Sequence, residues 1–256
     1  MSTSYATPAC APIRRAAGSR EACLCIHGFC GAPAVFLPLV DTILDAGYDC
    51  YAPLLPGHGT RPEDMIDVKL EHWLDTASAW LDELLPRYER VHLLGLSLGG
   101  AIASWLAGTR SGDKRLGKVM LLVPGYALRN KEFYQMDFEA MGDRLIPLAQ
   151  QVDLTPELEE SAFLYPFMAA KSIGQLLRMG GLALEQAPHI VQPTLMLYTA
   201  ADPVVDPEVC AQAAGEIPGL RAAHCYRKSG HNLLLDTERA DVVARLEAFL
   251  RLSWPL

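Results

Sequence analysis

Short apolar runs alternate with amphipathic segments along most of this chain. Residues 22–26, ACLCI, have the length and hydrophobic composition of a buried strand. Comparable runs predict further strands over residues 48–53, 90–96, 118–123, 193–199 and 221–227. Apolar residues that recur every three to four positions predict helices over residues 33–46, 70–85, 98–108 and 237–252. This alternation favours an α/β fold, with a mainly parallel sheet that helices cover on both faces.

Residues 125–190 interrupt the alternation. They are rich in Phe, Tyr, Met and Leu and are predicted to form short helices, with apolar residues at helical spacing over 171–187. A structureless loop of this length is uncommon in a compact domain. We therefore expect residues 1–256 to form a single domain in which residues 125–190 are an inserted helical cap. The cap is expected over the carboxyl ends of the strands, where open α/β sheets bind their ligands.

Composition narrows the classes of partner. The 256 residues include 22 Lys and Arg against 30 Asp and Glu, a formal net charge of −8, and no block of like charges. A mildly acidic chain without a basic patch is a poor candidate for binding nucleic acid or anionic lipid. The first twenty residues contain no apolar stretch of the length of a signal peptide or membrane helix. We expect a frayed tail there and no stable membrane insertion.

Cysteine usage indicates the compartment. The seven cysteines are irregularly spaced, which is not typical of a disulfide framework. Cys23 and Cys25 would share one face of a strand, but no second pair repeats their spacing, which argues against a zinc site. We expect buried thiols in a reducing, cytoplasmic compartment, and no bound metal.

Ser97 is the first candidate for chemistry. Residues 95–99, GLSLG, match G-x-S-x-G between a predicted strand and a predicted helix. A sharp turn here would lift the serine hydroxyl above the sheet, and the flanking glycines would allow close chain approach. The free N–H groups and positive dipole end of the following helix would point at the same place. The pattern predicts a nucleophile, but a five-residue match also occurs by chance, so partner residues must support it.

A nucleophilic serine needs a base. His231 follows the last predicted strand in a flexible loop at the carboxyl edge of the sheet, where the base of this kind of site is expected. His27 and His58 lie beside glycines in loops, and His224 lies inside a strand, where a structural role is favoured. His231 is therefore the predicted base.

The base needs a carboxylate to orient it. Asp202 directly follows the strand at 193–199 and is preferred. Asp206 is explained as the N-cap of a helix that begins at Pro207, and Asp236, just before the last helix, can also be a cap. Asp202 then precedes His231 in the chain, and the order Ser, Asp, His is that of the α/β-hydrolase fold.

Acyl transfer also needs donors for a developing oxyanion. The residue after the serine, Leu98, would supply one backbone N–H. The loop after ACLCI reads His27-Gly28-Phe29, and the N–H of Phe29 would supply the other. The Phe29 side chain can at the same time be a core aromatic, because the donor is backbone. Four elements at one edge of a sheet then point to the same chemistry.

On these residues the chain resembles the α/β-hydrolase superfamily over nearly its whole length. More narrowly, it is similar to bacterial carboxylesterases and monoacylglycerol lipases. The matching stretches are LCIHGFCGAP, YAPLLPGHGTRPED, VHLLGLSLGGAIA, TLMLYTAADPVVDP and SGHNLLLDTE. The resemblance implies an α/β-hydrolase fold with Ser97 as nucleophile, Asp202 and His231 as its partners, and Phe29 and Leu98 as oxyanion donors.

One position departs from the family. Thr or Ser often follows HGF, whereas this chain has Cys30, a weaker hydrogen-bonding group. A bulky thiol reagent at Cys30 is expected to block the site, because Cys30 is the neighbour of Phe29. The cap resembles the family least, so substrate preference transfers least.

The expected activity is hydrolysis of carboxylic esters through an acyl-enzyme, with no metal or cofactor. The apolar cap favours a small apolar ester substrate, either a short- to medium-chain acyl ester or a monoacylglycerol. Other readings are a thioesterase, a carbon–carbon bond hydrolase, or a ligand receptor on a hydrolase scaffold. Only scattered basic residues in the cap could meet the phosphates of CoA, which ranks the thioesterase second. The sequence leaves the oligomeric state open.

Overall fold

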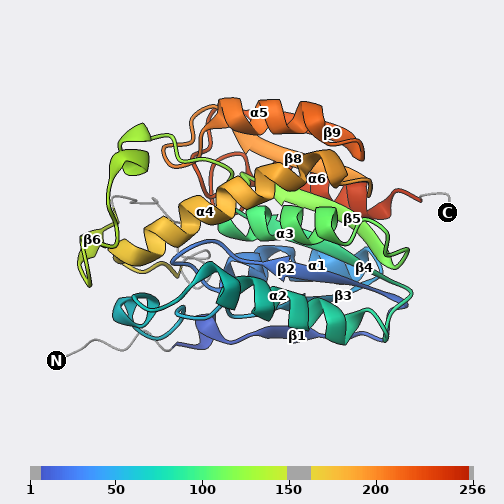
Figure 1. The fold of residues 1–256 in the computed structure, drawn as a ribbon. Helices are drawn as coiled ribbons and strands as arrows, with labels where there is room; N and C mark the ends of the chain where they lie inside the picture. The colour runs from blue at the N-terminus through green and yellow to red at the C-terminus, as the bar shows by residue number, and fades with distance from the viewer. Residues whose placement is uncertain (1–6, 149–162, 254–256) are drawn as a thin grey trace.

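A seven-stranded sheet forms the centre of the protein, which we describe from a computed structural model over residues 7–148 and 163–253 (Figure 1). Its strand order is β1-β3-β2-β4-β5-β8-β9. Only the pairing of β1 with β3 is antiparallel. The strands are β1 (Ile13–Arg15), β2 (Glu21–Ile26), β3 (Tyr48–Ala52), β4 (Arg90–Leu96), β5 (Leu116–Leu122), β8 (Thr194–Thr199) and β9 (Leu220–Tyr226).

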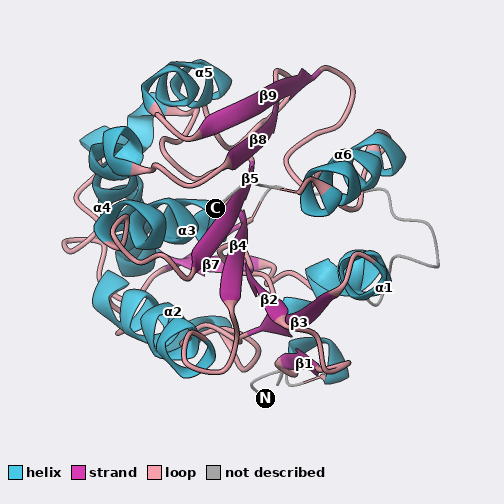
Figure 2. Ribbon diagram, turned by 90° about the vertical axis from the view of Figure 1, so that its right-hand side faces the viewer, coloured by secondary structure: helices cyan, strands magenta, loops and turns pink. Residues whose placement is uncertain are grey.

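Helices cover both faces of this sheet, as predicted. Figure 2 shows α1 and α6 on one face and α2, α3, α4 and α5 on the other. Their bounds are α1 (Leu37–Asp45), α2 (Leu70–Leu84), α3 (Leu98–Thr109), α4 (Ala170–Gln186), α5 (Pro207–Glu216) and α6 (Arg239–Arg251). Short 3₁₀ helices span Pro8–Cys10, Pro33–Phe36, Pro62–Met65, Lys131–Gln135 and Ala187–His189. The expected fold class is therefore confirmed.

The two faces of the sheet build two hydrophobic cores. In β2, Leu24 and Ile26 pack with α2 and α3, whereas Cys23 and Cys25 pack with α1 and α6. Because successive side chains of a strand point to opposite faces, a strand covered on both sides must be apolar throughout. The run ACLCI is the consequence, and it lies inside the sheet between β3 and β4.

The N-terminal segment differs from the expectation. Residues 13–15 are not part of a frayed tail but form β1, antiparallel to β3. Ile13 is buried, and the Arg14 guanidinium lies 3.9 Å from the Trp80 ring centre and donates to Glu83 at 2.9 Å. These contacts come from residues far along the chain, so a three-residue strand left no local pattern to recognise.

The described part of the region between β5 and β8 contains the helix expected over 171–187, as α4, and two short 3₁₀ helices, but also strands that were not expected. These strands are an antiparallel pair, β6 (Leu145–Pro147) and β7 (Phe167–Ala169), and the long helix α4 follows them. α4 lies across α3 (Figure 1). A Cβ on Gly180 of α4 would lie 2.4 Å from the Tyr126 carbonyl, so glycine is required for this close approach. Residues 149–162 of the predicted cap lie outside the described residues.

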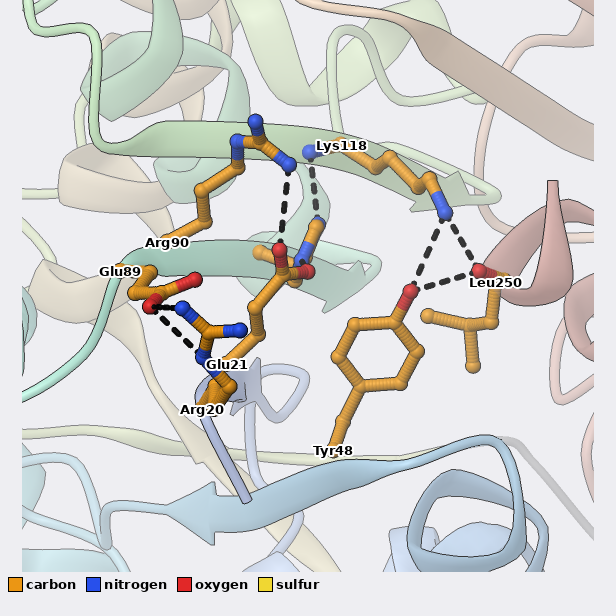
Figure 3. A network of polar contacts seen from close by, with 8 residues as sticks. Arg20, Glu21, Tyr48, Glu89, Arg90, Lys118 and Leu250 are labelled. Carbon is orange, nitrogen blue, oxygen red and sulfur yellow. Dashed lines mark hydrogen bonds and ion pairs between the residues drawn. The ribbon is translucent and has the colours of Figure 1, made fainter. Parts of the chain in front are cut away.

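A polar network ties the amino ends of the strands to the last helix (Figure 3). Lys118 of β5 is buried and donates to the Leu250 carbonyl of α6 and, at 3.2 Å, to the Tyr48 hydroxyl. Arg90 and His92 both bind Glu21, at 3.1 and 2.8 Å. The hydrogen bond from His92 lowers the pKa of Glu21. This end of the sheet is thus fixed by structural contacts.

In the ranges the structure describes, no helix is both long and apolar enough to cross a membrane.

Candidate active site

Ser97 occupies a sharp turn between β4 and α3. Its φ is 55°, a left-handed value that is strained for a residue with a side chain. The flanking glycines make the turn possible. A Cβ on Gly95 would lie 2.2 Å from the Gly99 carbonyl, and one on Gly99 would lie 1.8 Å from the Ile26 carbonyl. The G-x-S-x-G spacing therefore follows from backbone packing. The turn leaves the Ser97 side chain above the sheet, and the residue as a whole is 9% exposed to solvent.

His231 lies against Ser97. Its Nε2 is 2.9 Å from Ser97 Oγ, and its Nδ1 is 2.8 Å from Asp202 Oδ2. An ionised carboxylate can only accept, so Nδ1 carries a proton and Nε2 is free to accept from the serine hydroxyl. Ser97, His231 and Asp202 thus form one hydrogen-bonded chain from three separate loops.

The loop that carries His231 is fixed by two carboxylates that follow it. Asp236 accepts a hydrogen bond from the Gly230 N–H at 2.7 Å, and Glu238 accepts from the Ser229 N–H at 2.8 Å. Sequence reasoning considered Asp236 only as a helix cap and did not consider Glu238. The structure places Glu238, not Asp236, at the N-cap position of α6.

Asp202 is almost completely buried, at 1% exposure. Its second oxygen, Oδ1, accepts from the N–H groups of Val204 and Val205 at 2.8 and 2.9 Å. Both carboxylate oxygens therefore have partners, as a buried charge requires. The Arg129 guanidinium donates to the Asp202 carbonyl at 2.5 Å and ties this loop to the segment that follows β5.

Asp206 has a structural role instead. It caps α5 by accepting from the Glu208 N–H at 3.0 Å, and it pairs with Lys131 at 2.5 Å. The hydrogen bond from Lys131 lowers the pKa of Asp206. The structure therefore brings Asp202 to His231 and leaves Asp206 at a helix terminus.

Leu98 and Phe29, whose N–H groups are the predicted oxyanion donors, belong to two segments that meet at Ser97. Leu98 is the first residue of α3, and the first N–H groups of a helix have no partner inside it. Phe29 belongs to the loop after β2, which passes so close that a Cβ on Gly28 would lie 3.3 Å from Ser97 Cβ. No hydrogen bond among the described residues uses the Phe29 N–H.

A cavity of about 600 Å³ is lined by Ser97, His231 and Phe29. Apart from Ser97 and His231, the polar side chains in its lining are Asn130 and Asn232, within the described residues. The rest is apolar and comes largely from the region between β5 and β8, including Leu128, Phe133, Ile146, Pro147, Leu148, Phe163, Leu164, Met168, Ile173 and Leu176. The site therefore combines a few convergent polar atoms with an apolar chamber, as ligand pockets commonly do.

His27 and His58 are buried beside the site, and sequence reasoning gave neither of them a role. His27 Nε2 accepts from the Leu55 N–H and His58 Nε2 accepts from the Cys30 N–H, both at 3.0 Å. Burial lowers the pKa of His27 to about 3 and that of His58 to about 4, so both rings are neutral near pH 7. The signal that could have identified them is their place next to glycines in the two loops that meet here.

Cys30 is fully buried with its Sγ 3.8 Å from the Phe167 carbonyl. Burial raises the pKa of this thiol far above its ordinary value, so it is not a nucleophile near pH 7. The structure does not support the expectation that thiol reagents reach it. No cluster of three or more potential metal ligands occurs among the described residues.

Comparison with known proteins places the chain in a family. The model of the alpha/beta hydrolase family matches residues 23–246. The chain is 26% identical over 241 residues to a carboxylesterase of Bacillus subtilis (strain 168), covering 93% of this chain and 95% of that protein. It is 36% identical over 84 residues to a thermostable monoacylglycerol lipase of Bacillus sp. (strain H-257), a match of 33% of this chain and 34% of that protein. Among solved structures, one reported for LipS and LipT, two metagenome-derived lipolytic enzymes, superposes with a TM-score of 0.84 at 25% identity, covering 95% of this chain and 98% of that one.

Proposed function

The chain belongs to the alpha/beta hydrolase family, and on that premise we propose that it hydrolyses carboxylic esters with Ser97 as nucleophile. The observation that carries the proposal is the hydrogen-bonded chain from Ser97 through His231 to Asp202, which opens onto an apolar cavity. The relatives named as a carboxylesterase, a monoacylglycerol lipase and lipolytic enzymes support an ester as the substrate.

Acylation follows from this geometry. Ser97 Oγ attacks the ester carbonyl carbon while His231 Nε2 accepts the serine proton. Asp202 keeps Nδ1 of His231 protonated and stabilises the imidazolium that forms. The carbonyl oxygen gains negative charge and accepts from the N–H groups of Phe29 and Leu98. The tetrahedral adduct then expels the alcohol, which leaves with the proton from His231.

In deacylation, water takes the place of Ser97 as the nucleophile, and Ser97 Oγ becomes the leaving group. Water enters, His231 Nε2 accepts its proton, and the hydroxide attacks the acyl carbonyl carbon. The second tetrahedral adduct breaks at the bond to Ser97 Oγ, which recovers a proton from His231. The carboxylic acid is released and the enzyme is regenerated. Every proton that moves in the cycle passes through one imidazole, so no cofactor is needed.

The substrate class follows from the lining of the cavity. Its apolar side chains favour an acyl chain, and each buried methylene contributes about 0.8 kcal/mol to binding. We propose short- to medium-chain acyl esters or monoacylglycerols as substrates. Within the described residues, the lining includes no Lys or Arg, which disfavours the phosphates of an acyl-CoA and ranks a thioesterase second.

We also propose that residues 125–190 act as the cap of this site. In support, Phe133, Ile146 and Met168 of that region line the cavity together with Ser97.

The state of the cysteines bears on the compartment. All seven cysteines are free thiols, which supports a reducing, cytoplasmic compartment.

A series of p-nitrophenyl esters of graded chain length tests the substrate class. We expect kcat/KM to rise from acetyl to about six to twelve carbons, by up to roughly fourfold per methylene, and then to level off as the cavity fills. Monoacylglycerols should be hydrolysed faster than triacylglycerols. Hydrolysis that is fastest with acetyl and falls with every added methylene would overturn the lipid-ester assignment, while leaving a serine hydrolase.

A further inference from the structure

The residue after Phe29 has a strained backbone. Cys30 has a φ of 62°, a left-handed value that is strained for a residue with a side chain. Such a conformation persists only when its surroundings hold it. The Cys30 N–H shares a peptide unit with the Phe29 carbonyl, and the Phe29 N–H lies on the preceding unit, on the other side of the Phe29 Cα. The direction of the Phe29 N–H therefore depends on how the Phe29–Cys30 peptide unit is held, through the backbone torsions of Phe29.

Two hydrogen bonds hold the Cys30 backbone from opposite sides. Its N–H donates to His58 Nε2 at 3.0 Å, and its carbonyl accepts from the Tyr165 N–H at 2.9 Å. A third bond, from the Gly31 N–H to the Gly28 carbonyl at 3.1 Å, closes the turn. The partners of Cys30 come from two distant segments, the loop after β3 and the segment before β7.

His58 is itself oriented for this task. Its Nδ1 lies 3.0 Å from the Pro56 carbonyl, which can only accept, so Nδ1 carries the proton and Nε2 offers a lone pair to Cys30. Burial lowers the pKa of His58 to about 4, which keeps that lone pair free near pH 7. A protonated His58 would present a donor to the Cys30 N–H and could not hold it.

Tyr165 fixes the position of His58. The two rings lie nearly parallel, at 7°, with centroids 6.4 Å apart. The Tyr165 hydroxyl accepts from the Thr60 N–H at 2.8 Å and donates to the Gly57 carbonyl at 3.1 Å, so it binds the chain on both sides of His58. Tyr165 therefore contacts the Cys30 carbonyl with its backbone and the loop of His58 with its side chain.

We propose that His58, supported by Tyr165, is a positioning residue that holds the Cys30 peptide in its left-handed conformation and so aims the Phe29 N–H at the oxyanion. The inference rests on the proposed function, since it concerns the oxyanion donor of that reaction. Phe29 is part of the cavity lining, whereas His58 and Tyr165 are absent from it over the described residues. His58 therefore acts through Phe29 without touching substrate.

Matched substitutions test the inference. His58→Leu removes the acceptor. His58→Gln places an amide oxygen about where Nε2 lies, and His58→Asn places it nearer Nδ1, out of reach of Cys30. His92→Gln is the control, because His92 is also buried and also accepts a backbone N–H, from Lys118 at 2.8 Å, at the other end of the sheet.

The main readout is the rate at which a p-nitrophenyl alkylphosphonate labels Ser97, since its phosphoryl oxygen occupies the oxyanion position. kcat and KM for a p-nitrophenyl ester, the affinity for 1-octanol and the thermal midpoint are measured beside it. We expect labelling and kcat to fall about 10²-fold in His58→Leu and His58→Asn, and much less in His58→Gln. KM and the octanol affinity should hardly change. His92→Gln should lower the thermal midpoint without slowing labelling.

The outcomes separate the two proposals. Labelling of His58→Leu at the wild-type rate, or a loss that appears in KM and octanol affinity as much as in kcat, would overturn the role of His58. Equal activity of His58→Gln and His58→Asn would do the same. If the wild type is phosphonylated at Ser97 but hydrolyses no ester, the proposed function fails while the comparison of His58 variants still decides the inference. A wild type that is not phosphonylated would overturn both.

Discussion

The Asp202 carboxylate lies 2.8 Å from Nδ1 of His231 and has no freedom to turn away from it. Its other oxygen is held by the N–H groups of Val204 and Val205, and the residue is 1% exposed. The imidazole therefore meets an acceptor that is already in place, which is the condition for keeping one tautomer of His231. The nearby Asp206 has no such relationship, because it caps a helix.

This contrast predicts different effects at the two carboxylates. Asp202→Asn presents an amide to His231, stabilises the wrong tautomer and should reduce kcat about 10⁴-fold. Asp206→Asn keeps a good helix cap and loses only an exposed pair with Lys131, so kcat should stay near the wild-type value. Steady-state kinetics on both variants decides the matter. A larger loss in Asp206→Asn would mean that the acid is misassigned.

The glycines of the serine turn give a prediction about stability. Gly99→Ala would put a Cβ 1.8 Å from the Ile26 carbonyl, so α3 would have to move away from β2. We expect a loss of about 3 kcal/mol or more in the free energy of unfolding, measured in urea. Gly112→Ala is the matched control, because nothing lies within 4 Å of that position. Equal stability of the two variants would contradict the close approach of the turn to β2.

Thiol reagents should not react with the cysteine beside the active site, Cys30. Cys225 is exposed, whereas the other six cysteines are buried, and burial raises the pKa of Cys30. A maleimide added to the native protein should modify Cys225 alone and leave hydrolysis intact, and the Cys225→Ser protein should remain unmodified. Mass spectrometry of the peptides identifies the labelled residue. Modification of Cys30 with loss of activity would show that the loop after β2 opens to reagents.

The buried, neutral His58 predicts a loss of stability in acid. Its folded-state pKa is about 4, below the ordinary value of 6.5, so the unfolded chain binds the proton first as the pH falls. The stability that depends on neutral His58 is present above about pH 6.5 and is lost as the pH falls toward about 4. Near pH 4.5 the loss should be roughly 2–3 kcal/mol relative to pH 7.

Urea unfolding of the wild type and of His58→Gln, at pH 7 and at pH 4.5, measures the part of this stability loss that is due to His58. The variant lacks the titrating group, so its stability should fall less between pH 7 and pH 4.5. Burial, the main cause of the low His27 pKa, is the same in both proteins, and only the smaller contribution of the His58 charge is lost in the variant. An identical fall in the two proteins would mean that His58 is not held neutral in the fold.

Local patterns were enough to predict the sheet, most helices and the serine turn. ACLCI could be recognised because a strand buried on both faces has to be apolar at every position, and GLSLG because its glycines meet backbone atoms of neighbouring elements. The α/β-hydrolase fold expected from these stretches is confirmed. The positions of Asp202 and His231 after consecutive strands made their meeting with Ser97 predictable.

Features that depend on distant partners were not predictable in this way. β1 forms because it pairs with β3 and because Arg14 packs on Trp80, and both partners are far along the chain. β6 and β7 pair with each other, although more than fifteen residues separate them in sequence. The roles of His58 and Glu238 rest on backbone groups whose place is set only when two loops meet. Contacts of this kind cannot be predicted from a residue's type and its neighbours in the sequence.

The most direct test of the account is covalent labelling of Ser97. A p-nitrophenyl alkylphosphonate should add once per chain, with the phosphorus on the Ser97 peptide in mass spectrometry, and ester hydrolysis should fall in proportion to the labelled fraction. Ser97→Ala should take up no label and lose on the order of 10⁴-fold or more in kcat while folding normally. Label on another residue, or a Ser97→Ala protein that still hydrolyses esters, would contradict the central claim.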